Sequence, residues 1–455
     1  MPPHTRENGH CITPQIAVVV VPLPAQGHLN QLLHLSRILS SAAISIHYVG
    51  AATHLRQAKL RLHGWDNPSS TIHFHELPTP PFPNPTPNPH APNKFPSHLL
   101  PSFSAATHLR QPVHSFLTQL SPKFKRLVVI FDSLMSYVVQ DIDSIPNAEA
   151  YCFRCISAFT VLSFYWDAAG RPAPPPAIMT KIPPLAGIFP PEFSEFTNLN
   201  RSCRKISSAD LYNSSREIEG LYLDFMETVK TTGTDKIFAI GPLNPISLQS
   251  KIRHEYLDWL DAQDHDSVIL VSFGTTTSFQ TEQIRDLALG LERSEVKFIW
   301  VLREADKGDI FGGGARAPEL PEGFEERVRE RGVVVREWAA QVEILGHPAT
   351  GGFMSHCGWN SCMESISNGV PMAAWPMHSD QPTNAFLVAE VLGIAVRVVD
   401  WVYRNEVVAA ERVEAAVRRL MMAEEGGEMR RRAKELGASL SRDGEMDSFI
   451  THITR

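Results

Sequence analysis

Residues 352–361 read GFMSHCGWNS, an apolar run that ends in small and polar residues. The pattern predicts a strand, a tight turn and the start of a helix, because helix-forming residues follow, up to a glycine that favours a left-handed cap. A helix N-terminus presents unpaired backbone N–H groups and a partial positive charge, which suit a phosphate. Asn360 and Ser361 could donate to that phosphate, and Gly358 would let the backbone come close. The two polar residues could instead only cap the helix.

A second candidate for chemistry is His28, in the sequence PAQGHLN directly after the first apolar run. An unperturbed imidazole titrates near neutral pH, so a histidine at a strand exit suits a general base. Considered alone, His28 is more readily interpreted as a satisfied residue at a helix start. Asp132, at the end of the apolar run 127–132, could be a cap for the FDSLM segment. Asp141 and Asp143 fall later, on a predicted helix, and are less suited to act with His28.

The segments that must position these residues alternate between strand-like and helix-like patterns, which predicts a parallel α/β architecture. Residues 16–22 form a nearly continuous apolar run, typical of a sheet covered on both faces, and a helical stripe of leucines follows. A predicted helix covers residues 281–292, and further predicted strands cover residues 44–50, 127–132, 267–274, 297–303, 332–338, 351–356 and 371–376.

The length of 455 residues is too great for one ordinary core, so two domains are expected. The alternation breaks near residues 240–254 and then restarts. We therefore predict an N-terminal domain over 14–242, a linker over 243–252 and a C-terminal domain over 253–430, with a cleft at the carboxyl ends of the strands. The proline-dense segment 78–96 cannot form regular structure, and we interpret it as a wall or lid over a pocket.

The composition narrows the classes of partner. A formal net charge of −7 argues against nucleic acid or an anionic membrane surface as the main partner. The first apolar run is too short to span a bilayer, and the polar residues before it lack a signal-peptide core, so we expect a cytoplasmic protein. Six cysteines fit a reducing compartment. Cys152 and Cys155 are spaced CxxC, but without a second such pair a redox or metal site is a minor alternative to simple packing.

Residues 338–381 read WAAQVEILGHPATGGFMSHCGWNSCMESISNGVPMAAWPMHSDQ. This segment resembles the signature of the plant secondary-product glycosyltransferases in length and at nearly every defining position. The opening PAQGHLNQLLHLS, the proline-rich segment, FDSLM and the ending MDSFITHI resemble the zeatin O-glucosyltransferase branch of the UDP-glycosyltransferases. The resemblance implies an α/β fold of the GT-B type: two Rossmann-like doubly wound domains facing a central cleft. It also implies a UDP-sugar co-substrate and no cofactor or metal.

The resemblance further implies that a final helix, expected over 431–455, returns to the N-terminal domain. The segment 438–449 is poorer in glycine and serine than in relatives, which puts the packing of that helix in question. The implied donor-binding residues are Trp338 and Ala339 at the uracil ring, Gln341 near the nucleoside, His356, Gly358, Asn360 and Ser361 at the diphosphate, Trp359 at the hexose, Glu364 at the ribose, Asp380 and Gln381 at the glucose hydroxyls, and Gly274 and Thr275 as a further phosphate contact.

In the family that this sequence resembles, the histidine at the position of His28 is the general base, and an aspartate at the position of Asp132 orients it, as in other His–Asp pairs. Leaving-group charge would be met by the helix N-terminus, with no divalent ion. Residues 264–266 match a metal-binding DxD literally, but they precede a strand instead of following one. Direct displacement would invert the configuration at the anomeric carbon.

The expected reaction is transfer of glucose from UDP-glucose to a small lipophilic hydroxyl acceptor. Gln381 closes the signature where galactose-using relatives often carry histidine, although xylosyltransferases occur in the same branch. A zeatin-type cytokinin is the first expected acceptor and a flavonoid or other phenolic the second, because aromatic residues of the first domain offer a flat apolar wall. These residues are Phe82, Phe95, Phe103, Phe159 and Trp166.

Two alternatives belong to other classes of protein. A dinucleotide-dependent oxidoreductase would need GxGxxG after the first strand, and the turn PLPAQGHLN lacks it. A catalytically silent UDP-sugar-binding protein would not need the histidine and the aspartate, and both are present.

Overall fold

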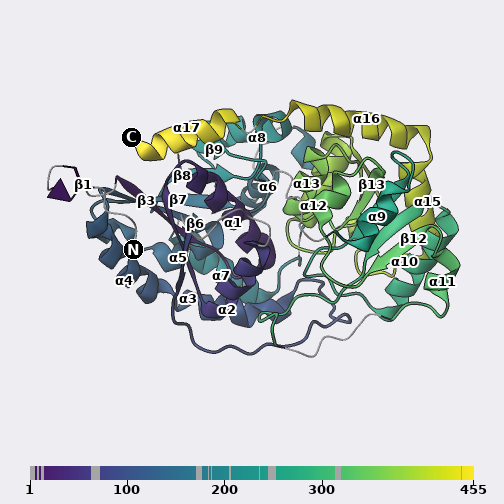
Figure 1. Ribbon diagram of the computed structural model, residues 1–455, viewed down its shortest axis with the longest axis horizontal. Helices are drawn as coiled ribbons and strands as arrows, with labels where there is room; N and C mark the ends of the chain where they lie inside the picture. Colours follow the sequence, from purple (N-terminus) through teal and green to yellow (C-terminus); the bar gives the residue numbers. More distant parts are fainter. Residues whose placement is uncertain are drawn as a thin grey trace.

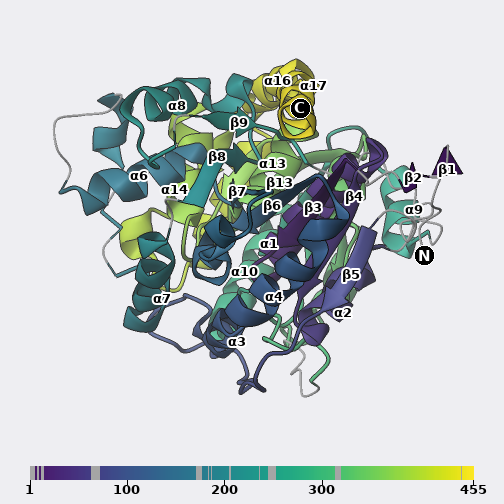
Figure 2. The same cartoon turned by 90° about the vertical axis from the view of Figure 1, so that its left-hand side faces the viewer.

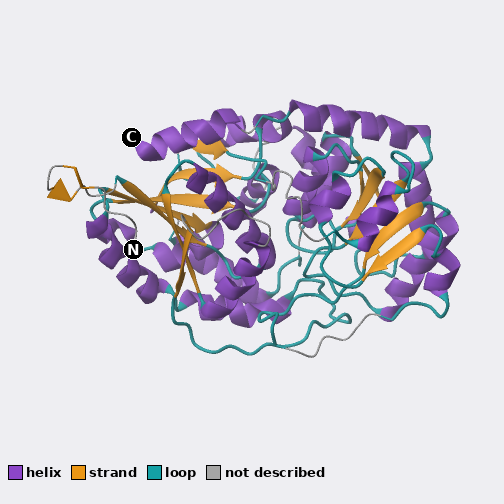
Figure 3. Ribbon diagram, viewed as in Figure 1, coloured by secondary structure: helices purple, strands orange, loops and turns teal. Residues whose placement is uncertain are grey.

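The computed structural model describes residues 6–7, 10–11, 15–62, 72–170, 177–182, 184–185, 187–203, 206–234, 236–243, 253–312, 319–441 and 443–455. They form two lobes, each built on a parallel β-sheet with helices on both faces (Figure 1; Figure 3). This confirms the predicted α/β architecture. Of the predicted linker 243–252, only Leu243 lies among the described residues, and most of the polar stretch before residue 15 lies outside them.

The sheet of the N-terminal lobe has seven parallel strands in the order β5-β4-β3-β6-β7-β8-β9. The central strands β3 and β6 are buried at nearly every position, because helices cover both faces of the sheet and neither face meets water. Figure 2 looks onto this lobe, with α3 and α4 in front of the strands. The strands are Ile16–Val21 (β3), Ser45–Gly50 (β4), Ile72–Glu76 (β5), Arg126–Asp132 (β6), Ala148–Arg154 (β7), Ser207–Tyr212 (β8) and Ile237–Ala239 (β9).

The sheet of the C-terminal lobe has six parallel strands in the order β12-β11-β10-β13-β14-β15. The predicted strands of both lobes agree with the observed ones to within a few residues, whereas β5, β7, β8, β9 and β15 were not predicted. The strands are Val268–Ser272 (β10), Lys297–Val301 (β11), Gly332–Val335 (β12), Thr350–Ser355 (β13), Met372–Ala374 (β14) and Ala395–Arg397 (β15). A separate antiparallel pair joins Arg6–Glu7 (β1) to His10–Cys11 (β2).

The helices cover these sheets and fill the ends of the lobes. Among the described residues, no helix is long and apolar enough to cross a membrane. The α-helices are Gln26–Ser41 (α1), Ala52–Lys59 (α2), Leu100–Thr107 (α3), Arg110–Leu120 (α4), Ser136–Val139 (α5), Ala158–Ala168 (α6), Pro191–Ser202 (α7), Arg216–Val229 (α8), Glu255–Asp261 (α9), Thr281–Ser294 (α10), Phe324–Val328 (α11), Gln341–Leu345 (α12), Trp359–Ser367 (α13), Gln381–Phe386 (α14), Ala410–Met421 (α15), Glu424–Ser439 (α16) and Asp443–Thr454 (α17).

Each sheet has one position where the order of the strands reverses along the chain, between β3 and β6 and between β10 and β13. In open parallel sheets, ligands bind outside the carboxyl ends of the strands at such positions. His28 follows β3, Asp132 ends β6, and His356 follows β13. The topology therefore brings the candidate residues of both lobes to the crevice between the sheets.

The last two helices run along one side of both lobes (Figure 1). Helix α16 packs against α13 and α15, so residue 431 lies within the C-terminal lobe and not at the start of the crossing. Helix α17 alone reaches the N-terminal sheet, where Phe449 packs edge-on against Tyr151 and Phe238 at centroid distances of 5.4 and 5.3 Å. Full burial of such a ring stabilises by about 1.5–3 kcal/mol. The low glycine and serine content before α17 is compatible with this packing.

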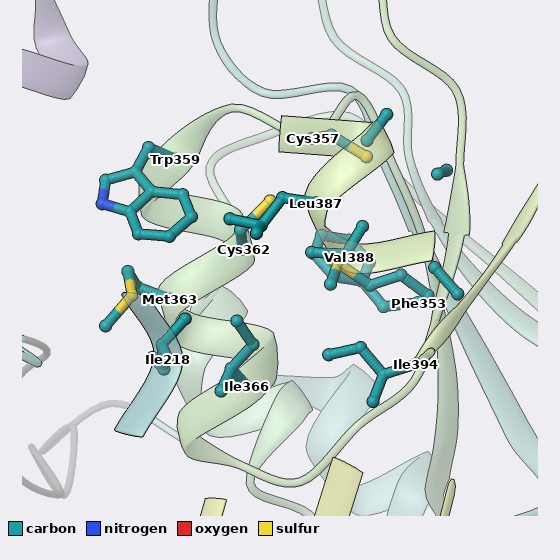
Figure 4. Close-up of a cluster of buried hydrophobic side chains, with 14 of the residues drawn as sticks. Ile218, Phe353, Cys357, Trp359, Cys362, Met363, Ile366, Leu387, Val388 and Ile394 are labelled. Carbon is teal, nitrogen blue, oxygen red and sulfur yellow. The ribbon is translucent and has the colours of Figure 1, made fainter. Parts of the chain in front are cut away.

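Helix α13 is fixed by its apolar face, which Figure 4 shows in detail. Cys362, Met363 and Ile366 are fully buried in a cluster that includes Phe353 and Val388. Since residues three and four apart share a helix face, the positions between them, including Asn360 and Glu364, turn toward the interlobe cleft. The core packing of α13 thus directs its N-terminus and its polar residues at the cleft.

Candidate active site

The cleft between the lobes has a volume of about 2350 Å³ and is lined by both sheets' carboxyl-end turns. His28 and Cys155 line it from the N-terminal lobe. Of the residues expected to bind the donor, all except Gln381 line it: Gly274, Thr275, Trp338, Ala339, Gln341, His356, Gly358, Trp359, Asn360, Ser361, Glu364 and Asp380.

His28 and Asp132, separated by 104 residues in the sequence, form a hydrogen bond of 2.6 Å between Nδ1 and Oδ2. The Asp132 side chain is fully buried, whereas the imidazole of His28 is 24% exposed. Oδ1 of Asp132 accepts a hydrogen bond of 2.9 Å from the backbone N–H of Leu134. Asp132 therefore serves both as the cap that its sequence position suggested and as the partner of the histidine.

The electrostatics of this pair favour a strong base. Burial lowers the pKa of His28, but the charge of Asp132 and their hydrogen bond outweigh it and raise the pKa above its ordinary 6.5. Burial raises the pKa of Asp132, but His28 and the other hydrogen bonds bring it below its ordinary value. Because Asp132 engages Nδ1, Nε2 is the ring nitrogen available to a ligand in the cleft.

The N-terminus of α13 faces the cleft. Gly358 is the N-cap residue and has no side chain to cap the helix, and the Asp380 carboxylate interacts with the backbone N–H of Trp359, the first residue of α13. Asn360 and Ser361 thus do not cap the helix: the Asn360 amide donates across the cleft to the Gly27 carbonyl at 2.9 Å. Cys357, just before the turn, has a left-handed φ of 61°, which is a strained conformation for a non-glycine residue. The turn therefore brings the start of α13 beside the residue that precedes His28.

Two glycines make room for His356 at this turn. A Cβ on Gly274, whose φ is +72°, would lie 2.6 Å from the His356 Nε2 atom, and a Cβ on Gly358 would lie 2.5 Å from it. Burial lowers the pKa of His356 to about 4, so the ring is neutral at physiological pH. Such a ring can donate to a phosphate oxygen from one nitrogen only.

Glu364 projects from α13 one turn beyond the anion site. Its Oε2 accepts a hydrogen bond of 2.6 Å from Gln341, which also donates to Ser361 at 3.0 Å. Burial raises the pKa of Glu364 to about 7, only partly offset by the bond from Gln341. Trp338, at the start of this segment, is 49% exposed, and the Arg61 guanidinium of the other lobe lies 4.8 Å from its ring centroid.

The two residues expected at the glucose hydroxyls behave differently. Asp380 lines the cleft, and burial raises its pKa to about 6 although Asn384 donates to it at 2.7 Å. Gln381 does not line the cleft, because its Oε1 accepts from the backbone N–H groups of Met377 and His378. Gln381 thus braces the turn that carries Asp380, a correction to its expected direct contact.

Trp359 also has a structural partner. Its side chain is only 2% exposed, and its indole N–H donates to the Asn213 carbonyl of the other lobe at 2.8 Å. The ring therefore joins the two lobes, and Trp359 also lines the cleft.

The expected aromatic wall is corrected in part. Phe95 and Phe103 line the cleft, whereas Phe82 stacks on His54 outside it. Phe159 and Trp166 lie on the same face of α6, and both pack into the hydrophobic core. The opposite face of α6 and the segment 188–193 supply the remaining aromatic side chains of the wall, which are Phe164, Tyr165, Phe189 and Phe193.

Residues 264–266 lie before β10, at the end of the sheet opposite to the cleft, and Asp266 pairs with Lys434 at 2.8 Å. The structure therefore gives no support to a metal-binding DxD. Cys152 and Cys155 are both buried and are not joined by a disulfide. Arg110 binds Asp141 through two hydrogen bonds, away from the histidine.

Sequence reasoning missed several residues that line the cleft, among them Arg154 and Arg303. Arg303 lies two residues beyond β11, so the rule that ligands gather at strand ends could have found it. Arg154 ends β7, a strand that was not predicted, and binds Asp210 at 2.9 Å. No local signal marked it.

Two family descriptions match the chain: "Glycosyltransferase, N-terminal domain" over residues 14–245, and "UDP-glucoronosyl and UDP-glucosyl transferase" over residues 240–425. The zeatin O-glucosyltransferase of Phaseolus lunatus is 51% identical over 454 residues, covering 97% of this chain and 97% of the relative. The chain belongs to the UDP-glycosyltransferase family. The zeatin O-xylosyltransferase of Phaseolus vulgaris is 49% identical, over 97% of this chain and 98% of the relative.

A solved UGT transferase from Siraitia grosvenorii in complex with UDP has a TM-score of 0.77 to this UDP-glycosyltransferase at 28% identity, covering 97% of this chain and 100% of that one. The GT-B fold inferred from the sequence is thereby confirmed. The protein is therefore a glycosyltransferase of this family.

Proposed function

We propose that this UDP-glycosyltransferase is an inverting O-glucosyltransferase that transfers glucose from UDP-glucose to the hydroxyl of a zeatin-type cytokinin. The observation that carries the proposed mechanism is the hydrogen bond from Asn360 to the Gly27 carbonyl. It holds the start of α13 next to His28, because Gly27 is the residue before the histidine. A general base and an anion-binding helix end then face one space, as displacement of a nucleoside diphosphate requires.

In the proposed reaction, His28 Nε2 takes the proton of the acceptor hydroxyl while the hydroxyl oxygen attacks the anomeric carbon of the sugar. The bond from that carbon to the β-phosphate oxygen breaks, and UDP leaves with the electron pair. Asp132 fixes the tautomer of His28 and stabilises the imidazolium. The backbone N–H groups of α13, with Ser361 and His356, receive the diphosphate, and attack from the opposite side inverts the anomeric configuration.

The donor-binding roles follow from the positions of the cleft residues. Trp338 is half-exposed and would stack on the uracil ring, and Glu364 lies one helical turn beyond Asn360 and Ser361, where it would accept from the ribose hydroxyls. Asp380 is placed to accept from sugar hydroxyls. The expected domain division, at residues 243–252, stays part of this proposal, as does the cytoplasmic location.

Donor choice between glucose and xylose is open to a direct test, because relatives with either activity in their names are almost equally similar to this chain. The two sugars differ by one hydroxymethyl group, for which a pocket typically discriminates by about 10–200-fold. We expect UDP-glucose to win a competition against UDP-xylose and UDP-galactose, with products resolved by mass spectrometry. A win by UDP-xylose would make the protein a xylosyltransferase of the same mechanism.

The acceptor is proposed from the aromatic wall and from the names of the relatives. Phe95, Phe103, Phe189 and Phe193 form an apolar surface that fits a planar ring better than a second sugar. The test compares kcat/KM for trans-zeatin, cis-zeatin and a panel of flavonoids with one donor. A flavonoid that exceeded both zeatins by more than about tenfold would replace the cytokinin by a phenolic acceptor. Absence of UDP release with every acceptor would instead indicate a silent UDP-sugar-binding protein.

A further inference from the structure

The carboxylate of Asp132 has a third hydrogen-bond donor besides His28 and the backbone of Leu134. The thiol of Cys155 donates to Oδ2 of Asp132 at 3.1 Å, the same oxygen that His28 Nδ1 contacts at 2.6 Å. Cys155 is only 5% exposed and lines the cleft. One oxygen of Asp132 thus receives both the imidazole and the thiol.

The backbone holds Cys155 in this position from two sides. Strand β7 runs parallel to β6, with Phe153 opposite Asp132, so Cys155 begins the turn directly beyond the aspartate. The Gln31 amide of α1 donates to the Cys155 carbonyl at 2.9 Å. Since Gln31 lies three residues after His28 on the same helix, the histidine, the aspartate and the cysteine are fixed to one another through three elements.

The protonation state suits a donor. Burial, and then the negative charge of Asp132, raise the pKa of Cys155 well above its ordinary value. The group is therefore a neutral thiol across the working pH range, and its S–H points a weak positive dipole at the carboxylate. A cysteine activated as a nucleophile would need the opposite shift.

We propose that Cys155 is a positioning residue that acts through Asp132, holding Oδ2 in line with His28 Nδ1 and moderating the charge that the imidazole meets. The inference rests on the proposed general-base role of His28. A donor on the shared oxygen withdraws part of the negative charge from the imidazolium, so Cys155 sets the basicity of His28 below the value that a bare Asp132 would impose. Loss of the thiol should both loosen the pair and make His28 harder to deprotonate.

Other titratable groups face this cluster and enter the design of the test. The Asp380 carboxyl, whose pKa burial raises to about 6, acts on both His28 and Cys155 from α14. Tyr48 of β4 donates to the Leu29 carbonyl, and burial raises the pKa of its phenol well above the ordinary value, so it stays neutral. Cys152 of β7 also contributes to the field at Cys155.

The experiment records kcat, KM for both substrates, and the pH profile of kcat/KM for Cys155→Ala and Cys155→Ser. We expect Cys155→Ala to lower kcat by about three- to tenfold, the size of one weak hydrogen bond to a charged group. Its acidic limb should move to higher pH by about half a unit, with KM for UDP-glucose unchanged. Cys155→Ser keeps a donor and should recover kcat to within about twofold, with the limb returned toward that of the wild type.

Cys152→Ala is the matched control, because Cys152 is also a buried thiol, lies in β7 three residues before Cys155, and packs among apolar side chains such as Val129 and Phe131. It should leave the limb in place. In the Asp380→Asn background, Cys155→Ala should still move the limb by the same amount. In the Asp132→Asn background, Cys155→Ala should have no further effect, because a residue that acts through Asp132 cannot add to its loss.

The outcomes separate the two proposals. If Asp132→Asn and His28→Ala keep wild-type activity, the general-base assignment is wrong and Cys155 loses its role with it. If those variants are inactive but Cys155→Ala matches Cys152→Ala in kcat and in its pH profile, the general base stands and the inference about Cys155 is overturned. If Cys155→Ala folds poorly, Cys155→Ser and Cys155→Thr take its place. In these variants an acidic limb at the wild-type pH supports the inference, and a displaced acidic limb contradicts it.

Discussion

The polar side chains of the two cleft walls differ in how fully their hydrogen bonds are satisfied within the chain. In the N-terminal wall, Asp132 receives hydrogen bonds from His28, Leu134 and Cys155, so the acid–base pair is complete within the chain. In the C-terminal wall, the described residues leave buried His356 Nδ1 and Asn360 Oδ1 without a hydrogen-bond partner. Buried polar atoms of this kind are costly unless a ligand satisfies them. In the proposed mechanism, the acid–base pair is therefore preformed, whereas the donor site would be completed by the UDP-sugar.

The carboxyl groups of the two walls show the same contrast. The pKa of Asp132 lies below its ordinary value, although burial acts to raise it, because three donors and the charge of the imidazole stabilise the anion. Burial raises the pKa of Asp380 to about 6 and of Glu364 to about 7, where amide donors compensate less. Sugar hydroxyls would supply the missing donors. The comparison predicts that substitutions in the N-terminal wall lower kcat, while those in the C-terminal wall weaken donor binding.

The largest effect is expected for His28→Ala. Loss of the general base should lower kcat by about 10²–10⁴-fold, while UDP affinity stays within about twofold, because the nucleotide contacts lie on the other wall. Steady-state kinetics and calorimetric titration with UDP measure the two quantities. Residual activity above about a tenth of the wild type would show that another group takes the proton.

The corresponding substitution in the C-terminal wall of the cleft is Glu364→Ala. Removing the carboxylate that is placed for the ribose should raise KM for the UDP-sugar by about 10–100-fold, since hydrogen bonds to charged groups contribute about 1.5–3 kcal/mol. The acidic limb of the acceptor kcat/KM profile, at saturating donor, should not move. Glu364→Gln is the conservative comparison, and a KM near the wild type in both variants would remove the ribose contact from the proposal.

The pH dependence tests the preformed pair directly. His28 must be neutral to accept a proton, so kcat/KM should fall about tenfold per pH unit below its raised pKa, on a limb that lies above pH 6.5. Asp132→Asn removes the charge that raises this pKa, while the burial that lowers it remains, so the limb should move to lower pH. Rates measured from about pH 5.5 to about pH 9 cover the acidic limb of the wild type and that of Asp132→Asn. A limb displaced upward by Asp132→Asn would contradict the assignment.

The smallest effect is expected for Gly274→Ala. Its Cβ would lie 2.6 Å from His356 Nε2 at a φ of +72°, so the ring must shift and the backbone is strained. We expect KM for the UDP-sugar to rise by about three- to tenfold, with kcat almost unchanged. Gly170→Ala is a matched control, because Gly170 has a similar φ of +76° and a Cβ there meets no atom within 4 Å. Equal effects of the two substitutions would show that backbone strain alone is responsible.

What the sequence by itself determined about this protein is mostly local. Apart from Gly274 and Thr275, the proposed donor-binding residues lie in one segment, 338–381, where a strand, a turn and a helix follow one another, so spacing along the chain determines spacing in space. The apolar runs likewise identified the central strands β3, β6, β10 and β13, because strands buried on both faces carry a continuous signal. The edge strand β15 lacks that signal and was not predicted. Strands β7 and β8, whose sequences mix polar and apolar residues, were not predicted either.

What only the tertiary structure decided concerns residues whose partners are distant in the chain. Periodicity separates the two faces of α6, but it cannot tell which one meets the core, so Phe159 and Trp166 were assigned to the cleft although their face is packed. Gln381 turns inward because backbone N–H groups need an acceptor there. The convergence of His28, Asp132 and Cys155 depends on the order of β3, β6 and β7 in the sheet. Strand order is set by packing between segments that are distant in the sequence, so local residue patterns do not predict it.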